Sequence, residues 1–372
     1  HEQMVELAVK MKQQEGLEEL EKELQQQNKA EPSQGYLDLL LKVGAGRGNS
    51  GDPEGAMKAL EEALQVCEKL GVSNAEGGVS VLMAIGATKG RMGDHKEALA
   101  SFEKAKDICL GAPTGLQSPQ GGKLMRGLGF AKGSLGDKQG ALDAFEEGLQ
   151  HLQTGQLMNS LEGAALLMAK GNGLAHKGER EAAVSSWEAA RKALEAAGLL
   201  GTPDAVAVYR KLATHNGTLG KHEVAVELFQ QAKSSADKCQ MLDRPDGAEL
   251  LQCMGAAQAA AGQHQGALDS FQRAKDILER AGLMMSPGGA ALQTSIGLSK
   301  GRLGDHDGAL EAFQVARSIH EHLKHPADSP AGVRIAELIA VAQEQARKVD
   351  AEEDGLIGSP EQRARTSKKG CV

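Results

Sequence analysis

Four histidines occupy equivalent places in this chain of 372 residues, each two residues after a glycine. Histidine is the usual acid–base catalyst and metal ligand near neutral pH. The four are His95, His222, His264 and His306, and each belongs to a different copy of a repeated segment. Because the copies are separate structural units, we do not expect the four imidazoles to converge on one catalytic or metal site.

A second candidate for chemistry is the glycine-rich stretch G-L-G-F-A-K-G at residues 127–133. A phosphate-binding glycine loop follows a strand and opens a helix, whereas this stretch lies inside a predicted helix. The sequence has no H-E-x-x-H, G-x-S-x-G or P-loop motif. We therefore expect no enzyme activity, no catalytic residues, no cofactor and no metal site.

Seven glycines recur at spacings of 42 or 43 residues, which indicates a repeat array rather than one globular core. An alanine follows each glycine by five residues, a large apolar residue stands four further on, and a small residue three further. Steps of four and three place these residues on one helical face. Five of the six Phe and the one Trp occupy the large apolar position, so they are predicted to fill the space between helices. The seven glycines are Gly51, Gly93, Gly136, Gly178, Gly220, Gly262 and Gly304.

A second predicted helix precedes each of these glycines. Seven residues before the glycine stands another small residue, six times Gly and once Ala. Glycine inside a helix costs about 1 kcal/mol relative to alanine, so its presence predicts close contact with a neighbouring helix. Prolines, favoured in a first helical turn, head several of these first helices. They are Pro119, Pro203, Pro245, Pro287 and Pro330, four of them preceded by Ser or Thr N-caps at 118, 202, 286 and 329.

The residues after the turn glycine predict the start of the second helix. Asp94, Asp137 and Asp305 are expected to cap it, with Glu97 completing a capping box with Asp94. Each repeat is therefore predicted to be helix–turn–helix. The fold class is all-α, with about seven such repeats and capping helices at the two ends.

Composition narrows the function classes. The net charge is −8 and the pI about 5.8, whereas nucleic-acid-binding proteins usually carry a basic surplus, so we expect no nucleic-acid partner. No run of 18 apolar residues exists to form a transmembrane segment. Five cysteines show no metal-ligand spacing and are expected to be reduced, which favours a cytoplasmic location. An organelle or a cilium stays open, because the chain begins at His1 and its true N-terminus is unknown.

This pattern resembles the tetratricopeptide repeat family, in which a small residue and a turn glycine precede alanine, aromatic and alanine at the offsets above. The resemblance covers about residues 34–350. The family's ordinary repeat has about 34 residues, so the longer period here lengthens each helix by about a turn. Such long repeats are similar to those of kinesin light chains and of some polarity and receptor-clustering scaffolds. The resemblance implies a right-handed α-solenoid.

In that family the first helix of each repeat lines a concave groove. The resemblance therefore implies that residues 13, 10, 6 and 2 before each turn glycine face a partner. Basic residues there would receive carboxylates of an acidic peptide, Asn172 would bond a peptide backbone, and Phe130 with Met83 and Met168 would floor an apolar pocket. The alternative for each is an ordinary solvated or packed helix face. The partner-binding candidates are Met83, Arg91, Lys123, Arg126, Phe130, Met168, Asn172, Arg210 and Arg302.

Three functions fit these expectations. The first is a non-enzymatic protein-interaction scaffold that holds a peptide or helix in its groove. The second is a structural subunit of a large assembly, such as a ciliary or organellar complex, in which the convex face and both termini are buried as well. The third is a cargo adaptor like a kinesin light chain, although residues 1–30 hold too few heptads to bind a motor.

The chain is predicted to have three parts. Residues 1–30 form an amphipathic helix that caps the array or pairs with a partner helix. Residues 31–350 form the solenoid, ending in a capping helix from Pro330 to about Val349. Residues 351–372 are a polar tail with a basic end, predicted to be flexible.

Overall fold

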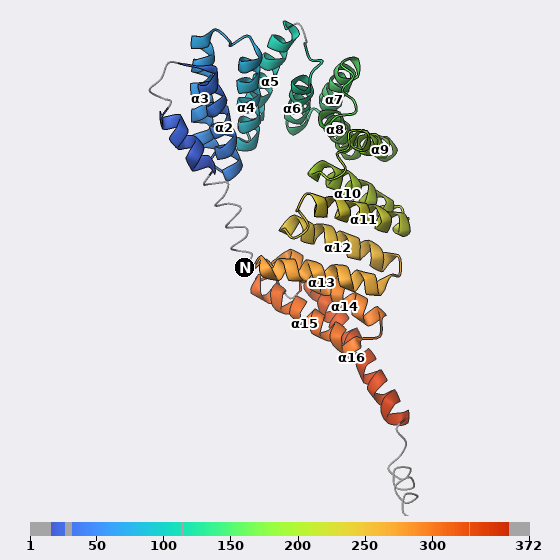
Figure 1. Ribbon diagram of the computed structural model, residues 1–372. Coiled ribbons are helices and arrows are strands. Elements are labelled where there is room, and N and C mark those ends of the chain that lie inside the picture. Colours follow the sequence, from blue (N-terminus) through green and yellow to red (C-terminus); the bar gives the residue numbers. More distant parts are fainter. Residues whose placement is uncertain (1–15, 27–31, 113–114, 327, 357–372) are drawn as a thin grey trace, which may run out of the picture. The chain divides into compact units, whose positions relative to one another are not determined.

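The computed structural model describes residues 16–26, 32–112, 115–326 and 328–356, and all regular elements in these ranges are helices. The chain divides into two compact units, His1–His215 and Asn216–Val372. Within each unit, consecutive helices pack as antiparallel pairs (Figure 1). The fold is the predicted all-α repeat solenoid.

The first unit contains a helix over residues 16–26 and the helices α2 to α9, and most of α10. Their bounds are α2 Gln34–Ser50, α3 Pro53–Leu70, α4 Glu76–Met92, α5 His95–Leu110, α6 Pro119–Ser134, α7 Lys138–Thr154, α8 Leu161–Lys177, α9 Arg180–Ala196 and α10 Pro203–Thr218. The second unit contains the remaining helices. Their bounds are α11 His222–Lys238, α12 Pro245–Ala260, α13 His264–Arg280, α14 Pro287–Arg302, α15 His306–His322 and α16 Pro330–Leu356.

The seven repeating glycines form the turns within the repeats. Each has a positive φ, between 75° and 95°, a conformation that only glycine adopts without strain. The alanines five residues later are buried, which confirms that they lie at the contact between the two helices of a repeat.

The small residues of the first helices make room for the aromatic residues of the second. A Cβ placed on Gly129 would lie 2.2 Å from the Phe145 ring, and one on Gly171 would lie 2.5 Å from the Trp187 ring. The same pairing, always sixteen residues apart, recurs in four further repeats. These pairs are Gly44–Leu60, Gly86–Phe102, Gly255–Phe271 and Gly297–Phe313. The predicted close helix contact is confirmed, and its cause is the ring that the glycine accommodates.

Helix starts follow the predicted caps with one exception. Asp137 and Asp305 accept hydrogen bonds from the backbone N–H of Gly140 and Gly308. Asp94 occupies the N-cap of α5 but makes no such side-chain bond, so the predicted capping box is wrong. The third residue of α5 is Glu97, and its carboxylate instead pairs with Lys89 of α4.

The aspartate caps that do form the bond share one feature. Asp52 also caps its helix, accepting from the N–H of Gly55 at 2.8 Å. Asp52, Asp137 and Asp305 each have glycine at the third helical position, where α5 has Glu97.

The helix over residues 16–26 packs on the first repeat. Its Leu17, Leu20 and Leu24 lie against the apolar core of α2 and α3. A Cβ on Gly46 of α2 would lie 2.9 Å from Leu17, just as one on Gly173 of α8 would lie 2.9 Å from Leu142 of α7. The helix therefore occupies the place of the second helix of a preceding repeat, which is how it caps the array.

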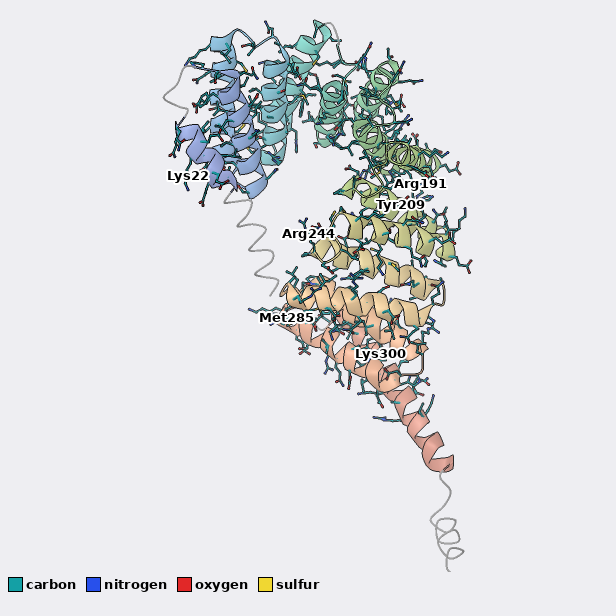
Figure 2. The ribbon with its side chains drawn as sticks, in the orientation of Figure 1. Lys22, Arg191, Tyr209, Arg244, Met285 and Lys300 are labelled. Carbon is teal, nitrogen blue, oxygen red and sulfur yellow. The ribbon has the colours of Figure 1, made fainter. Side chains whose placement is uncertain are left out.

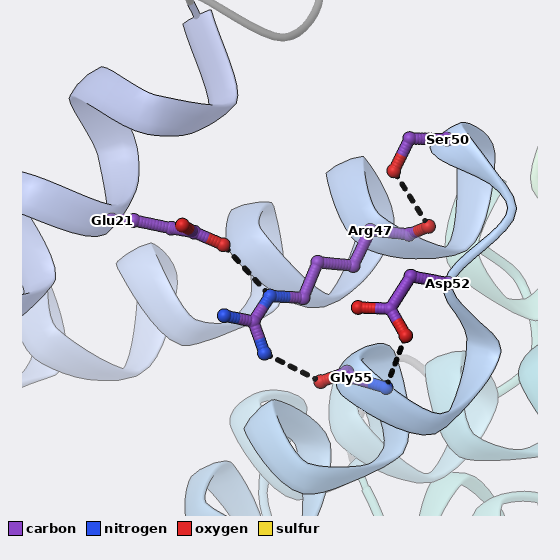
Figure 3. Close-up of polar contacts among 5 residues, drawn as sticks. All are labelled: Glu21, Arg47, Ser50, Asp52 and Gly55. Atoms are coloured by element: carbon purple, nitrogen blue, oxygen red, sulfur yellow. Dashed lines mark hydrogen bonds and ion pairs between the residues drawn. The ribbon is translucent and has the colours of Figure 1, made fainter.

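The acidic residue of an ion pair also recurs, although its partner sits at a different position. Glu21 follows Leu20 and accepts from Arg47 Nε of α2 at 2.8 Å, and Glu146 follows Phe145 and pairs with Lys170 at 2.9 Å. Figure 3 shows that Arg47 also donates to the Gly55 carbonyl at the start of α3, at 3.2 Å. One guanidinium thus connects three helices.

The C-terminal helix is longer than predicted. α16 begins at Pro330 as expected and continues to Leu356, about a turn and a half beyond the boundary set at residue 350. The predicted tail beyond it, with Cys371, lies outside the described residues. The four described cysteines are free, and Cys67 and Cys109 are buried on second helices as small apolar residues.

Candidate functional site

A groove runs along the first unit between α4 and α6, with α5 beneath. Along each of these helices the lining residues recur at steps of three and four, so one face of each helix lines the whole groove. First helices also contact the next first helix, as α4 does α6 and α6 does α8. No second helices of the described chain contact each other to that extent, so first helices lie inside the local curvature. We call this surface the α4–α6 groove.

One end of the groove is a hollow of about 340 Å³ near the repeat turns. Gly86 and Gly90 of α4 and Gly127 of α6 are among its lining residues. The Phe102 ring forms its base, and a Cβ on Gly127 would lie 2.7 Å from that ring. Phe130 stands at its edge, 51% exposed and in edge contact with the Phe145 ring.

Arg91 lies at the rim of this hollow. Its guanidinium donates to the Thr88 hydroxyl at 3.2 Å, and no carboxylate of the described residues pairs with it. The neighbouring Lys89 is held by Glu97, whose carboxyl pKa is lowered by this hydrogen bond and by the charge of the lysine. The Arg91 guanidinium lies against Gly48 of α2, where a Cβ would come within 2.2 Å of it. Arg91 is therefore an exposed cation at the rim of the hollow, turned toward α2.

The other end of the groove is a larger hollow of about 600 Å³. Met83 and Ser80 of α4 face Gln120 and Lys123 of α6 across it. Gln120 donates to the Ser80 hydroxyl at 2.8 Å, which ties the two walls together. This end is mixed in character, with polar groups around an apolar base that includes Ile108 of α5.

Glu162, at the start of α8, changes the electrostatics expected for the groove. It is 6% exposed. Its carboxylate lies 3.5 Å from Arg126 Nη2 and 3.9 Å from Lys123 Nζ. The two cations predicted to receive a partner's carboxylates therefore already share one within the chain. Both contacts are long, and Arg126 Nε is buried without a hydrogen-bond partner.

The remaining predicted residues lie elsewhere. Met83 and Phe130 line different hollows and Met168 of α8 lines neither of the two, so these hollows do not bring the three residues together. Asn172 of α8 has a buried side-chain oxygen without a partner. Arg210 of α10 is engaged in an interaction within the chain, and Arg302 ends α14 in the second unit.

The sequence pattern does not identify Glu162, because its pairing with Lys123 and Arg126 depends on a contact between consecutive first helices. The sequence places it in the first turn of α8, where an acidic residue also suits the helix dipole. Its pairing with residues 36 and 39 positions earlier follows only once α6 and α8 lie side by side. A signal existed in retrospect, since Lys123 and Arg126 form a basic pair one turn apart opposite that position.

Nothing in the described residues groups three His, Cys, Asp or Glu side chains closely enough to hold a metal ion. The four repeated histidines stand at or next to the first turns of α5, α11, α13 and α15. Within the described part of the chain, no helix is long and apolar enough to cross a membrane.

The tetratricopeptide repeat family model matches residues 79–110, which form most of α4 and all of α5. No curated protein matches the chain. Among solved structures, BtubC (BKLC) from P. vanneervenii is similar with a TM-score of 0.54 and 16% identity, over 66% of this chain and 92% of that chain. This likeness shows the solenoid fold.

Two further solved structures are similar over other fractions of this chain. The nearly identical TPR-like repeats designated kinesin light chain from Podosopora anserina give a TM-score of 0.48 at 18% identity, over 56% of this chain and 99% of that chain. The TPR2AB domain of yeast Sti1, solved with pHSP90, gives 0.31 at 14% identity, over 84% of this chain and 100% of that chain.

Proposed function

We propose that this chain holds a peptide segment of a partner protein in the α4–α6 groove. It belongs to the tetratricopeptide repeat family, whose fold is used by protein-interaction scaffolds. The observation that carries this proposal is the apolar hollow beside Arg91. A half-exposed Phe130 and the exposed Arg91 both line one cavity of about 340 Å³, with the Arg91 guanidinium resting beside it against Gly48 of α2. Concave apolar surface with a few polar groups at its edge is typical of ligand-binding sites.

The chemistry of the ligand follows from the lining. The hollow takes a bulky apolar side chain against Phe102 and Phe130, and Arg91 pairs with a carboxylate next to it. Arg grips carboxylates with two parallel hydrogen bonds. Lys123 and Arg126 contribute less, because Glu162 already neutralises part of their charge.

The groove also sets the length of the segment. From Ser80 to Arg91 the α4 wall spans about 16 Å at 1.5 Å per residue. An extended peptide covers that distance in about five residues at roughly 3.3 Å each. The segment therefore places its apolar anchor about five residues from the part that contacts Met83 and Gln120.

Binding of this kind needs no chemical step. The groove is formed before the ligand arrives, so little ordering free energy is lost on binding. We accordingly assign the chain a non-enzymatic scaffold role. No particular observation in the described chain favours the assembly-subunit or cargo-adaptor role.

The test begins with selection of binding peptides from a random displayed library on the wild-type chain. The affinity of a selected peptide is then measured by fluorescence anisotropy for Arg91→Glu, Phe130→Ala and Lys104→Glu. Lys104 is exposed on α5 and is no part of the groove lining, so it controls for the change of charge. We expect enrichment of apolar and acidic residues, with affinity reduced at least about tenfold by the first two substitutions, a change worth about 1.4 kcal/mol.

The third substitution is expected to leave affinity unchanged. Equal affinity of all four proteins for every selected peptide would remove the α4–α6 groove as the binding site. Circular dichroism of each variant confirms that the helices are intact.

A further inference from the structure

The turn that carries Arg91 occurs a second time in the chain. Residues 89–95 read K-G-R-M-G-D-H and residues 300–306 read K-G-R-L-G-D-H. No other repeat has an arginine at this place: the corresponding residues are Asn49, Ser134, His176, Thr218 and Ala260. The two copies lie in different units, at the ends of α4 and α14.

In both copies the lysine is paired with a carboxylate, although the acidic residue differs. In the first, Lys89 is held by Glu97, and in the second, Lys300 pairs with Asp305 at 3.4 Å. Figure 2 labels Lys300 at the end of α14. Arg302, like Arg91, is exposed and pairs with no carboxylate of the described residues.

The apolar partner of the arginine recurs as well. Phe130 stands 39 residues after Arg91, and Val341 stands 39 residues after Arg302, each on the next first helix. Phe130 is 51% and Val341 57% exposed. Each helix starts at a proline, Pro119 and Pro330, in the same register.

One difference sets the depth of the second copy. Gly127, which lines the hollow in the first unit, corresponds to Leu338, which packs on the core of α15 and α16. Ala87 corresponds to Leu298, which is 40% exposed. By this register we expect the second copy to be a flatter surface, with the exposed Leu298 and Val341 on the two first helices that follow the place of α4 and α6.

We propose that the chain has two sites for the same ligand chemistry, one at Arg91 and Phe130 and a weaker one at Arg302 and Val341. Each takes an acidic segment with an apolar side chain. The chain is thereby suited to a partner that carries two such segments. This proposal rests on the proposed function of the first site.

Two weak sites on one chain matter because a partner that engages both binds more tightly. Linking two binding segments raises overall affinity by about 10²–10⁴ where the linker allows both to bind. The chain would then select partners that carry two acidic-apolar segments over partners that carry one.

The test uses a synthetic peptide with a leucine flanked by aspartates, and a matched peptide with lysines in their place. Isothermal titration gives the number of sites on the wild type, Arg91→Glu, Arg302→Glu and the double variant. We expect about two, one, one and none for the acidic peptide, and no binding of the lysine peptide. The Lys104→Glu variant is expected to match the wild type.

The outcomes separate the two proposals. One site that is lost in Arg91→Glu and unchanged in Arg302→Glu would overturn the second site and leave the first. Binding that is unchanged in Arg91→Glu would overturn the proposed function. A tandem peptide with a long Gly/Ser linker is expected to bind the wild type at least about tenfold more tightly than either single variant, and equal affinity would contradict the bivalent role.

Discussion

At the scale of single residues, some helical glycines are needed for close packing and others are not. A Cβ added to Gly129 would lie 2.2 Å from the Phe145 ring, whereas one added to Gly133 would lie 3.6 Å from the Ala141 Cβ. The second distance is ordinary van der Waals contact. Two repeats already carry alanine at the place of Gly133, namely Ala175 and Ala259.

We therefore predict opposite effects of two substitutions four residues apart. Gly129→Ala forces the Phe145 ring to move and should cost about 1–3 kcal/mol. Gly133→Ala should stabilise by up to about 1 kcal/mol, because alanine is the better helix former. Urea denaturation followed by circular dichroism measures both. A destabilising Gly133→Ala, or a neutral Gly129→Ala, would show that ring packing does not determine these glycines.

Tyr36 gives a prediction in pH. Burial, together with the hydrogen bond and the charge of Glu62, raises the pKa of Tyr36 above its ordinary value. The unfolded tyrosine ionises near pH 10. The stability that comes from the raised pKa is therefore complete below about pH 10 and is lost as the pH rises above it.

The matched variant is Tyr36→Phe, which removes both the hydrogen bond and the ionisation. Its unfolding free energy should lie about 1 kcal/mol below that of the wild type at neutral pH. The difference should shrink as the pH is raised above 10. A difference that is constant to the highest pH at which the fold survives would contradict the raised pKa of Tyr36.

At the scale of elements, the helix over residues 16–26 takes the place of a second helix. Leu20 corresponds to the aromatic position, and Glu21, like Glu146, pairs with a basic residue of the next first helix. Lys22 is exposed on the same helix (Figure 2). The cap thus follows the packing rules of the repeats although it lacks their glycine and alanine.

We predict that Leu20→Glu separates this cap from α2 while Lys22→Glu leaves it in place. Burial of a charge among Leu17, Leu24 and the core of α2 is unfavourable, so amide hydrogens of residues 16–26 and of α2 should exchange faster. Nearest-neighbour stability of a solenoid should leave α12 to α15 unchanged. Hydrogen exchange followed by mass spectrometry measures the amide exchange rate of each helix separately. Faster exchange throughout both units would instead indicate one cooperative fold.

Much of the repeat could be predicted from the sequence because its determinants are local. Turn glycines, N-caps and the glycine sixteen residues before each ring depend on one helix pair. The failed capping box at Asp94 shows the limit even there, since Glu97 pairs with Lys89 of the preceding helix instead. The capping helix followed from its leucines, but its register against Gly46 did not.

At the scale of the whole molecule, the site was only partly predictable. Arg91 and Phe130 were identified by their offsets from the turn glycine, and the structure places both on one hollow. Three glycines on two helices are among the residues that line the hollow, and the neutralising Glu162 comes from a third helix. Contacts between repeats decide these features, and a single repeat's pattern does not contain them.

Glu162 leads to a prediction about Arg126. Arg126→Glu would place a second carboxylate beside one that is already buried. It should destabilise the first unit by about 2 kcal/mol, less than the roughly 3–5 kcal/mol of a fully buried pair, because Arg126 is about one-third exposed. Arg91→Glu, with no carboxylate partner to confront, should leave stability unchanged.

Thermal unfolding of the two variants checks this difference. The Arg126→Glu, Glu162→Gln double variant should recover most of the loss, since the repulsion is then removed. An Arg126→Glu variant as stable as Arg91→Glu would show that the long contacts to Glu162 carry no energy.

The central claim, that partners bind in the α4–α6 groove, is tested most directly by placing a photoreactive benzoylphenylalanine at residue 130 or at residue 104. A selected acidic-apolar peptide is added, irradiated, and the crosslinked fraction is measured by mass spectrometry. We predict strong crosslinking from residue 130, lost when Arg91→Glu is combined with it, and only background from residue 104. Crosslinking that is equal at the two residues, or unaffected by Arg91→Glu, would contradict peptide binding in this groove.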